Sequence, residues 1–211
     1  MSENREWTVG CRSYSRVMTA IATATTATTA TATAIAAAAA AADAPPVVAS
    51  APPLRRVDSP IGRIELIGNG SAVVSLTIER DGSLPHDGDK ERSDAVLDRA
   101  AAQLSEYFSG TRTTFDVPVT LRGTKFQKEV WGRLGELRFG EVTSYGELGL
   151  STGRATAGRA VGGAVGANPV PILVPCHRVL ASNNRITGYS GGNGIPTKVW
   201  LLNHEGIGHT E

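Results

Sequence analysis

The pattern of apolar and polar residues predicts a small α+β unit between residues 54 and 120. The runs SPIGRIELIG and AVVSLTIERDG are rich in β-formers, and Asn69-Gly70 between them is a strong signal for a hairpin. Because Pro118 cannot donate to a strand ladder, the run TFDVPV is expected to be a short edge strand. Nothing in this unit points to a particular chemistry, and we interpret it as scaffold.

A stretch with helical spacing of its apolar residues lies between these predicted strands. The stretch SDAVLDRAAAQLSEYFSG spaces its apolar residues as on one face of a helix, and Gly110 is well placed to end that helix. The residues expected on its apolar face are Val96, Ala100, Leu104 and Phe108.

Residues 121–211 predict a mainly helical segment with a buried loop. One helix begins with the capping-box pair Thr124 and Gln127, and a shorter helix begins with the equivalent pair Ser144 and Glu147. The inward stripe of the first helix is expected to be Phe126, Val130, Leu134 and Leu137. After a brief turn, TAGRAVGGAVG predicts a further helix, and this arrangement is typical of a helix-turn-helix.

The last of these helices carries a glycine at every fourth position. Gly158, Gly162 and Gly166 share one face, although each glycine costs a helix interior roughly 0.5–1 kcal/mol relative to alanine. A bare face is useful where another backbone must come close, so the helix suits the minor groove of DNA, with Arg159 beside it. Two alternatives stay open: the stretch is a loop, or the bare face packs on a neighbouring helix.

The charge of the chain is informative by region. The formal net charge of the 211 residues is +1, but residues 148–204 contain no Asp or Glu. The cations of this stretch are Arg154, Arg159, Arg178, Arg185 and Lys198. Such a stretch suits a polyanion, and the alternative is a locally neutral core segment with a few solvated arginines.

The first 53 residues differ in composition. Residues 17–42 are almost wholly Ala and Thr, which are too weakly apolar for a membrane span, and they predict a disordered low-complexity tail. An organelle-targeting segment is the alternative.

Cysteines at positions 11 and 176 do not make a disulfide framework, which favours a reducing, intracellular setting. The histidines are scattered and CxxC is absent from the sequence, so no metal site is expected.

Cys176 is the strongest candidate for chemistry. It follows the apolar run PILVP, which predicts a stiff, buried strand, and it stands beside His177 and Arg178. An imidazole is the usual means of forming a nucleophilic thiolate near neutral pH, but a lone buried cysteine is more often inert. Glu205, at the end of the closing helix PTKVWLLNHEG, either orients His177 or is a solvated residue at a helix end.

The run PVPILVPCHRVLASNNRITGYSGG closely resembles the methylated-DNA–protein-cysteine methyltransferases, which repair alkylguanine in DNA. The resemblance covers roughly residues 54–209 and extends to FGEVTSYGELG, GRAVGGAVGANPV and WLLNHEG in the same order. It implies an α+β fold with a small ribonuclease-H-like α/β scaffold domain (54–120) and a mainly helical, winged helix-turn-helix-like domain (121–211) that binds DNA and accepts the alkyl group. The tail (1–53) lies outside the resemblance.

The resemblance also implies the chemistry. Cys176 takes the alkyl group from the 6-oxygen of guanine irreversibly, so each molecule acts once. His177 acts as base through a water, and Glu205 polarises its imidazole. The target base is flipped out through the minor groove. The implied partner is double-stranded DNA with alkylated guanine; no cofactor, metal or membrane is involved, and the protein is a cytoplasmic monomer, nuclear in a eukaryote.

The resemblance assigns further residues to the site. Asn168 holds the site geometry, and Tyr145 assists rotation of the nucleotide and donates to the leaving guanine. The base pocket is lined by Tyr189, Ser190 and the backbone of Val179. The residues in contact with DNA are Arg159, which fills the gap left by the base, Tyr145, Ala157 and Gly162.

Two other functions stay open, and two positions depart from the family pattern. A non-catalytic lesion-binding protein would flip alkylguanine and recruit other factors, although relatives of that type lack the acceptor cysteine. A Cys–His hydrolase would turn over repeatedly and ignore DNA. Ala155 stands where the family commonly has proline before the recognition helix, and the spacer between Gly192 and Trp200 is longer than usual.

Overall fold

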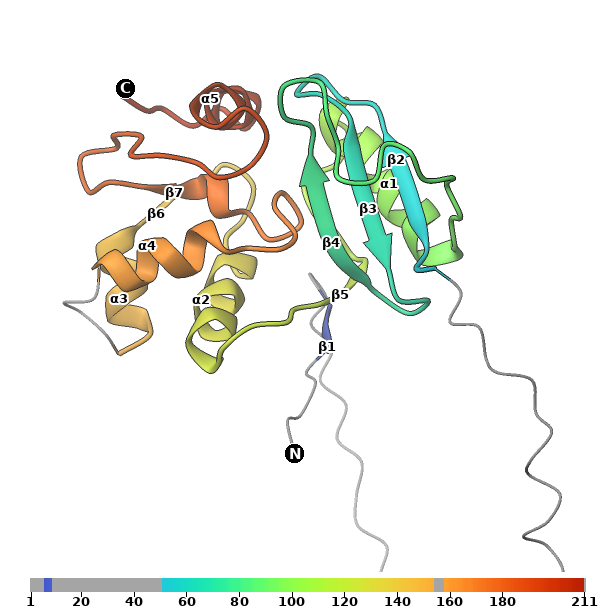
Figure 1. Cartoon of the computed structure of the whole chain (residues 1–211). Coiled ribbons are helices and arrows are strands. Elements are labelled where there is room, and N and C mark those ends of the chain that lie inside the picture. Colours follow the sequence, from blue (N-terminus) through green and yellow to red (C-terminus); the bar gives the residue numbers. More distant parts are fainter. Residues whose placement is uncertain (1–5, 9–50, 154–157, 211) are drawn as a thin grey trace, which may run out of the picture. The chain divides into compact units, whose positions relative to one another are not determined.

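A computed structural model describes residues 6–8, 51–153 and 158–210 of the chain (Figure 1). Strand β1 (Glu6–Thr8) falls inside the segment predicted to be a disordered tail, and its backbone pairs with strand β5 (Pro118–Thr120). For these three residues the expectation of disorder is wrong. The Ala/Thr-rich stretch lies outside the described residues, where disorder stays a prediction.

The strands form a sheet in the order β1-β5-β4-β3-β2. Strands β2 (Leu54–Val57), β3 (Ile64–Gly68) and β4 (Val73–Ile78) are antiparallel neighbours along the chain. The predicted turn joins β3 to β4, and it is stabilised by Asn69 Oδ1, which accepts from the Ala72 amide at 2.8 Å.

Strand β5 lies inside the sheet rather than at its edge. It pairs antiparallel with β1 and parallel with β4, where Val119 faces Val73, so the predicted edge position is wrong. Pro118 is the first residue of the strand, and its missing N–H therefore interrupts no ladder within β5.

Helix α1 (Ala95–Phe108) confirms the predicted helix, and Asp94 caps it by accepting from the Leu97 amide at 2.8 Å. The predicted apolar face is confirmed in part: Ala100 and Leu104 are completely buried, whereas Val96 and Phe108 are only partly buried. Leu97 and Tyr107, which were not predicted, are also completely buried. Apolar residues flank the predicted stripe on both sides, so periodicity alone did not fix which of them faces β2, β3 and β4.

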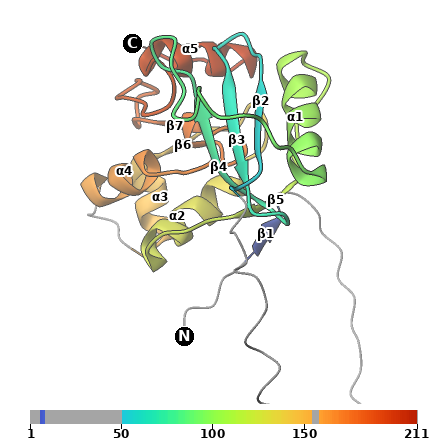
Figure 2. The same cartoon turned by 45° about the vertical axis from the view of Figure 1, so that its right-hand side comes forward.

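Helices α2 (Lys125–Gly135) and α3 (Tyr145–Ser151) begin with the two predicted capping boxes, and both boxes form. Trp131 was missing from the predicted inward stripe of α2, yet it is buried and its indole N–H donates to the Ala164 carbonyl at 2.8 Å. That bond ties α2 to helix α4 (Gly158–Gly166). Figures 1 and 2 both show α2, α3 and α4 grouped together.

The run PILVP is a buried turn, so the prediction of a strand is wrong. Ile172 has a φ of 72°, in the left-handed region, and Pro171 forms an isolated bridge with Val174. Prolines at both ends of the run remove the donors that a strand would need.

Two short elements and a closing helix follow this turn. The 3-10 helix η1 (Cys176–Arg178) leads into strand β7 (Val179–Leu180), which pairs in parallel with β6 (Thr143–Ser144). Helix α5 (Ile195–His204) completes the fold. Within the described ranges, every helix is too short or too polar to cross a membrane.

Candidate active site

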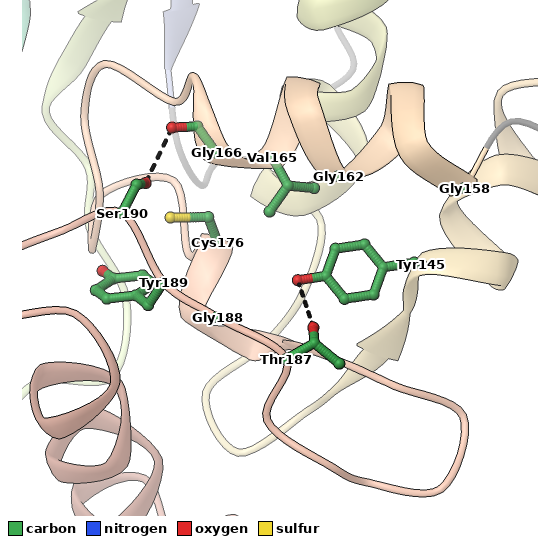
Figure 3. A pocket seen from close by; sticks show the side chains of 10 residues that line it. All are labelled: Tyr145, Gly158, Gly162, Val165, Gly166, Cys176, Thr187, Gly188, Tyr189 and Ser190. Atoms are coloured by element: carbon green, nitrogen blue, oxygen red, sulfur yellow. Dashed lines mark hydrogen bonds between the residues drawn. The ribbon is translucent and has the colours of Figure 1, made fainter.

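A cavity of about 390 Å³ opens between α3, α4 and the loop that follows β7 (Figure 3). Its volume lies within the roughly 300–1,000 Å³ that is typical of small-molecule sites. The lining residues are Tyr145, Gly158, Gly162, Val165, Gly166, Cys176, Thr187, Gly188, Tyr189 and Ser190. The cavity therefore brings together Cys176 and four other residues of the predicted site.

The turn before Cys176 fixes the position of its side chain. The Asn168 amide nitrogen Nδ2 donates to the Val174 carbonyl at 2.7 Å, and its Oδ1 accepts from the Val170 amide at 3.1 Å. The Cys176 amide donates to the same Val174 carbonyl at 2.8 Å. Asn168 thus braces the turn from which the cysteine enters the cavity.

The Cys176 thiol is a buried group. Cys176 is 4% exposed, and burial raises the pKa of its thiol. The Asn168 amide, the Tyr189 hydroxyl and the positive charge of Lys198 each act to lower that pKa, but burial has the larger effect. The resting side chain is therefore a neutral thiol, and a thiolate forms only when a base takes its proton.

The His177 ring is completely buried, and its Nε2 lies 2.8 Å from Glu205 Oε1. Because a carboxylate only accepts, Nε2 carries the hydrogen and Nδ1 is the acceptor. His177 Nδ1 is buried and has no hydrogen-bond partner in the described part of the chain. Burial lowers the pKa of His177 more than Glu205 raises it. The imidazole is therefore neutral near pH 7 and is able to accept a proton at Nδ1.

Glu205 is buried, so the alternative that it is a solvated helix-end residue is wrong. Besides His177, its carboxylate accepts from Arg178 at 2.7 and 2.9 Å, from the Tyr107 hydroxyl at 2.7 Å and from the Gly140 amide at 3.2 Å. Burial would raise the pKa of this carboxyl, but His177 and Arg178 outweigh burial and hold the pKa well below its usual range. Glu205 is a fixed anion that orients the imidazole.

Sequence reasoning missed the buried contacts of three residues around this centre. Tyr107 comes from α1, 98 residues away from Glu205, and no local signal could have linked the two. Arg178 was counted among the cations for a polyanion, but it is buried against Glu205. Lys198 is also buried; its Nζ donates to the Val179 carbonyl at 2.5 Å, and burial lowers the pKa of Lys198 to about 8.

The burial of Arg178 and Lys198 reduces the basic surface inferred from residues 148–204. Arg159 and Arg185 are exposed and available to a polyanion. Arg154 lies outside the described residues.

The glycine face of α4 is open, so both alternatives to a bare helical face are wrong. A Cβ added at Gly158 or Gly166 would meet no atom within 4 Å, and one at Gly162 would meet only Tyr145 Cε1, at 3.9 Å. Arg159 extends from the same helix. Ala157, predicted to contact DNA, and Ala155, where proline is usual, lie outside the described residues.

The loop after β7 supplies the other wall of the cavity (Figure 3). Ser190 Oγ donates to the Gly166 carbonyl at 2.9 Å, and Thr187 Oγ1 donates to the Tyr145 hydroxyl at 3.3 Å. Val179 is absent from the lining of the cavity. Its N–H donates to the Cys176 carbonyl and its carbonyl accepts from Lys198, and its role in the base pocket stays a prediction.

Comparison with known proteins decides the family. The model of the 6-O-methylguanine DNA methyltransferase ribonuclease-like domain matches residues 55–121, and that of the DNA binding domain matches residues 125–207. The methylated-DNA–protein-cysteine methyltransferase of Mycobacterium bovis is 43% identical over 138 residues, which are 65% of this chain and 84% of the relative. The chain belongs to the methylated-DNA–protein-cysteine methyltransferase family. The Haemophilus influenzae family member is 36% identical over 71% of this chain and 83% of its own.

Solved structures of methyltransferases agree with this membership. The crystal structure of Mycobacterium tuberculosis O6-methylguanine methyltransferase is 42% identical, with a TM-score of 0.65 over 72% of this chain and 92% of its own. The structure of the Mycobacterium tuberculosis protein OGT in complex with DNA gives the same values. Membership confirms the predicted family, the α+β fold with its ribonuclease-like unit and DNA-binding domain, and the enzyme class, a methyltransferase of DNA repair.

Proposed function

We propose that this methyltransferase repairs 6-O-methylguanine in double-stranded DNA by moving the methyl group irreversibly to Cys176. The observation that carries the proposal is the position of the thiol: Cys176 lines the cavity between the bare face of α4 and the 187–190 loop, while the adjacent His177 is held by Glu205. An inert core cysteine would not require a cavity lined by polar loop residues or a buried, anchored imidazole.

The proposed step begins with proton transfer. His177 Nδ1, through one water, takes the thiol proton as Cys176 Sγ attacks the methyl carbon. The S–C bond forms, the C–O bond breaks, and its electron pair goes to the 6-oxygen of guanine. The resulting imidazolium is stabilised by the anionic Glu205 at 2.8 Å from Nε2.

The leaving guanine takes one proton in place of the methyl group. Tyr145 lines the cavity, and its hydroxyl accepts from Thr187 at 3.3 Å, which leaves the phenolic proton available to the base. Water then carries the proton taken up by His177 to the Tyr145 phenolate, so both side chains end neutral. Cys176 becomes a methyl thioether, which has no leaving group under these conditions. Each molecule therefore acts once and needs no cofactor, and a monomer suffices because the site residues come from one chain.

DNA binding follows from the shape of α4. Atoms on a stacked base are out of reach inside a duplex, so the alkylated nucleotide is rotated into the cavity. The open face of Gly158, Gly162 and Gly166 suits close approach to the minor groove, and the exposed Arg159 occupies the gap in the stack.

The proposal is tested by incubating the full chain with duplex oligonucleotide that carries 6-O-methylguanine with a labelled methyl group. About one label per protein should become covalently attached, none to Cys176→Ala, and an undiminished amount to Cys11→Ala, which removes the other cysteine of the sequence. Label that stays on tightly bound DNA would identify a lesion-binding protein instead. Repeated turnover of an acyl substrate without any label transfer would identify a hydrolase.

The role of Arg159 has its own test. Arg159→Ala should slow repair of the duplex more than reaction with free 6-O-methylguanine, because only the duplex requires extrusion. Arg133→Ala is the matched control, since Arg133 is also an exposed arginine on a helix but pairs with Glu136 at 3.1 Å. An equal loss on duplex and free base would contradict the assignment.

A further inference from the structure

The loop that lines the cavity is rich in glycine, so its backbone can adopt many conformations. Residues 187–194 include four glycines, and φ is positive at Gly188 (150°), Gly192 (51°) and Gly194 (76°). Glycine adopts many backbone conformations at little cost, so such a loop needs external contacts to hold one shape. Tyr189 and Ser190, which line the cavity, belong to this loop.

Several contacts hold the loop to the C-terminal half of the chain. Ser190 Oγ donates to the Gly166 carbonyl, and Lys198 Nζ lies 3.4 Å from the Gly188 carbonyl. The Asn193 amide donates to Thr197 Oγ1 at 3.0 Å. These bonds fix the side of the loop that faces α4 and α5, and they leave the Ser190 and Gly192 carbonyls for another partner.

That partner is Arg80, from the unit interpreted as scaffold. Its Nε donates to the Gly192 carbonyl and its Nη2 to the Ser190 carbonyl, both at 2.7 Å, across more than a hundred residues of sequence. A guanidinium presents its donors in a fixed fork, so two bonds to carbonyls two residues apart define the loop geometry more tightly than a single bond.

The turn that carries Arg80 is itself well defined. It follows β4, and the Arg80 and Ser83 backbones exchange hydrogen bonds at 3.1 and 2.9 Å. The Asp81 amide of the same turn donates to Asn193 Oδ1 at 3.1 Å. The end of β4 also touches the loop, since a Cβ at Gly192 would lie 2.9 Å from Ile78 Cγ2. The sheet therefore presents Arg80 to the loop from a rigid support.

We infer that Arg80 is a positioning residue that sets the width of the alkyl pocket and so restricts the size of the alkyl group. The inference rests on the proposed function. With the Ser190 and Gly192 carbonyls held by Arg80, Tyr189 and Ser190 stay close to α4, and a methyl group is positioned against Cys176. Without Arg80, water can satisfy these carbonyls and the glycines permit the loop to move away from α4. Methyl transfer then loses its geometry, while a bulky group gains room.

The test compares Arg80→Ala and Arg80→Lys with the wild-type protein. Arg99→Ala is the matched control, because Arg99 lies on α1 in the same unit and pairs with Asp116 rather than with the turn that carries Arg80 or with the loop. The substrates are duplexes with 6-O-methylguanine or 6-O-benzylguanine. Arg80→Ala should lower the methyl-transfer rate by roughly ten- to hundredfold, in line with the effect of small misplacements in enzyme sites. Its benzyl-to-methyl rate ratio should rise, and Arg80→Lys should restore part of both changes.

A second readout needs no activity. Hydrogen–deuterium exchange of the peptide covering residues 187–194 should be faster in Arg80→Ala than in wild type and unchanged in Arg99→Ala. An unaltered benzyl-to-methyl ratio together with unaltered exchange would overturn the inference, as would equal losses in Arg80→Ala and Arg99→Ala. If the wild-type protein transfers no methyl group, the proposed function fails, and the exchange comparison still decides whether Arg80 holds the loop.

Discussion

Replacing Glu205 by glutamine tests the buried network behind Cys176. The substitution keeps the size of the side chain but removes its negative charge, and it turns one acceptor oxygen into an NH₂ donor. In either orientation of the amide, the new NH₂ group faces groups that themselves donate hydrogen bonds. At the Oε1 position these are His177 and Tyr107, and at the Oε2 position they are Arg178 and the Gly140 amide.

The expected magnitude follows from burial. The Arg178 and Glu205 side chains are 6% and 0% exposed, so the variant leaves a guanidinium charge without its buried counter-ion. Breaking a buried pair by removing one partner costs about 3–5 kcal/mol. For a protein of this size, each kcal/mol lowers Tm by about 2–4 °C, so the variant should melt roughly 6–20 °C below wild type. Methyl transfer should also slow, because the imidazolium loses its stabilising anion.

The assay is chemical and thermal unfolding of both proteins near neutral pH. The matched control is Glu136→Gln, which breaks an exposed pair between Arg133 and Glu136 at 3.1 Å. An exposed pair contributes less than about 1 kcal/mol, so the control should unfold close to wild type. Equal small losses in the two variants would refute the view that the Glu205 network is a buried, stabilising anion site.

Three further predictions follow from the same geometry. Tyr107→Phe removes the 2.7 Å bond to Glu205 and should cost about 1.5–3 kcal/mol in denaturant unfolding; an unchanged midpoint would contradict this. Gly162→Ala should leave the protein as stable as wild type, or up to about 1 kcal/mol more stable, but weaken duplex binding in a titration; unimpaired binding would contradict the close approach. Since burial lowers the pKa of His177, methyl transfer should keep its rate as pH falls to 6.5 and decline only below it; a decline centred above 6.5 would contradict a neutral resting imidazole.

Elements with strong local signals could be predicted from sequence. The Asn69-Gly70 hairpin and the capping boxes that begin α2 and α3 depend on residues within three or four positions of one another, and all form. The apolar run PILVP was misread because the period of a short buried run does not distinguish a strand from a turn. The turn depends on the left-handed backbone of Ile172, which nothing in the composition of the run predicts.

The candidate site also contains residues that the sequence predicts and residues that it does not. Cys176 and His177 are adjacent and were recognised from their motif, and the structure sets Tyr145, Tyr189 and Ser190 around the same cavity. The supporting residues come from far along the chain, and only tertiary packing brings them in. Neither Tyr107, which donates to Glu205, nor Arg80, which holds the pocket loop, carries a local pattern that distinguishes it from an ordinary surface or core residue. The scaffold unit therefore contributes to the site in a way that periodicity and motifs do not reveal.

The most direct measurement is peptide mass spectrometry of folded protein that has reacted with a duplex containing 6-O-methylguanine. The peptide with Cys176 should carry one methyl group in place of the thiol hydrogen, the peptide with Cys11 should be unchanged, and the DNA should contain ordinary guanine. Repaired DNA beside an unmodified Cys176, or a folded protein that leaves both the lesion and the sulfur intact, would contradict the account.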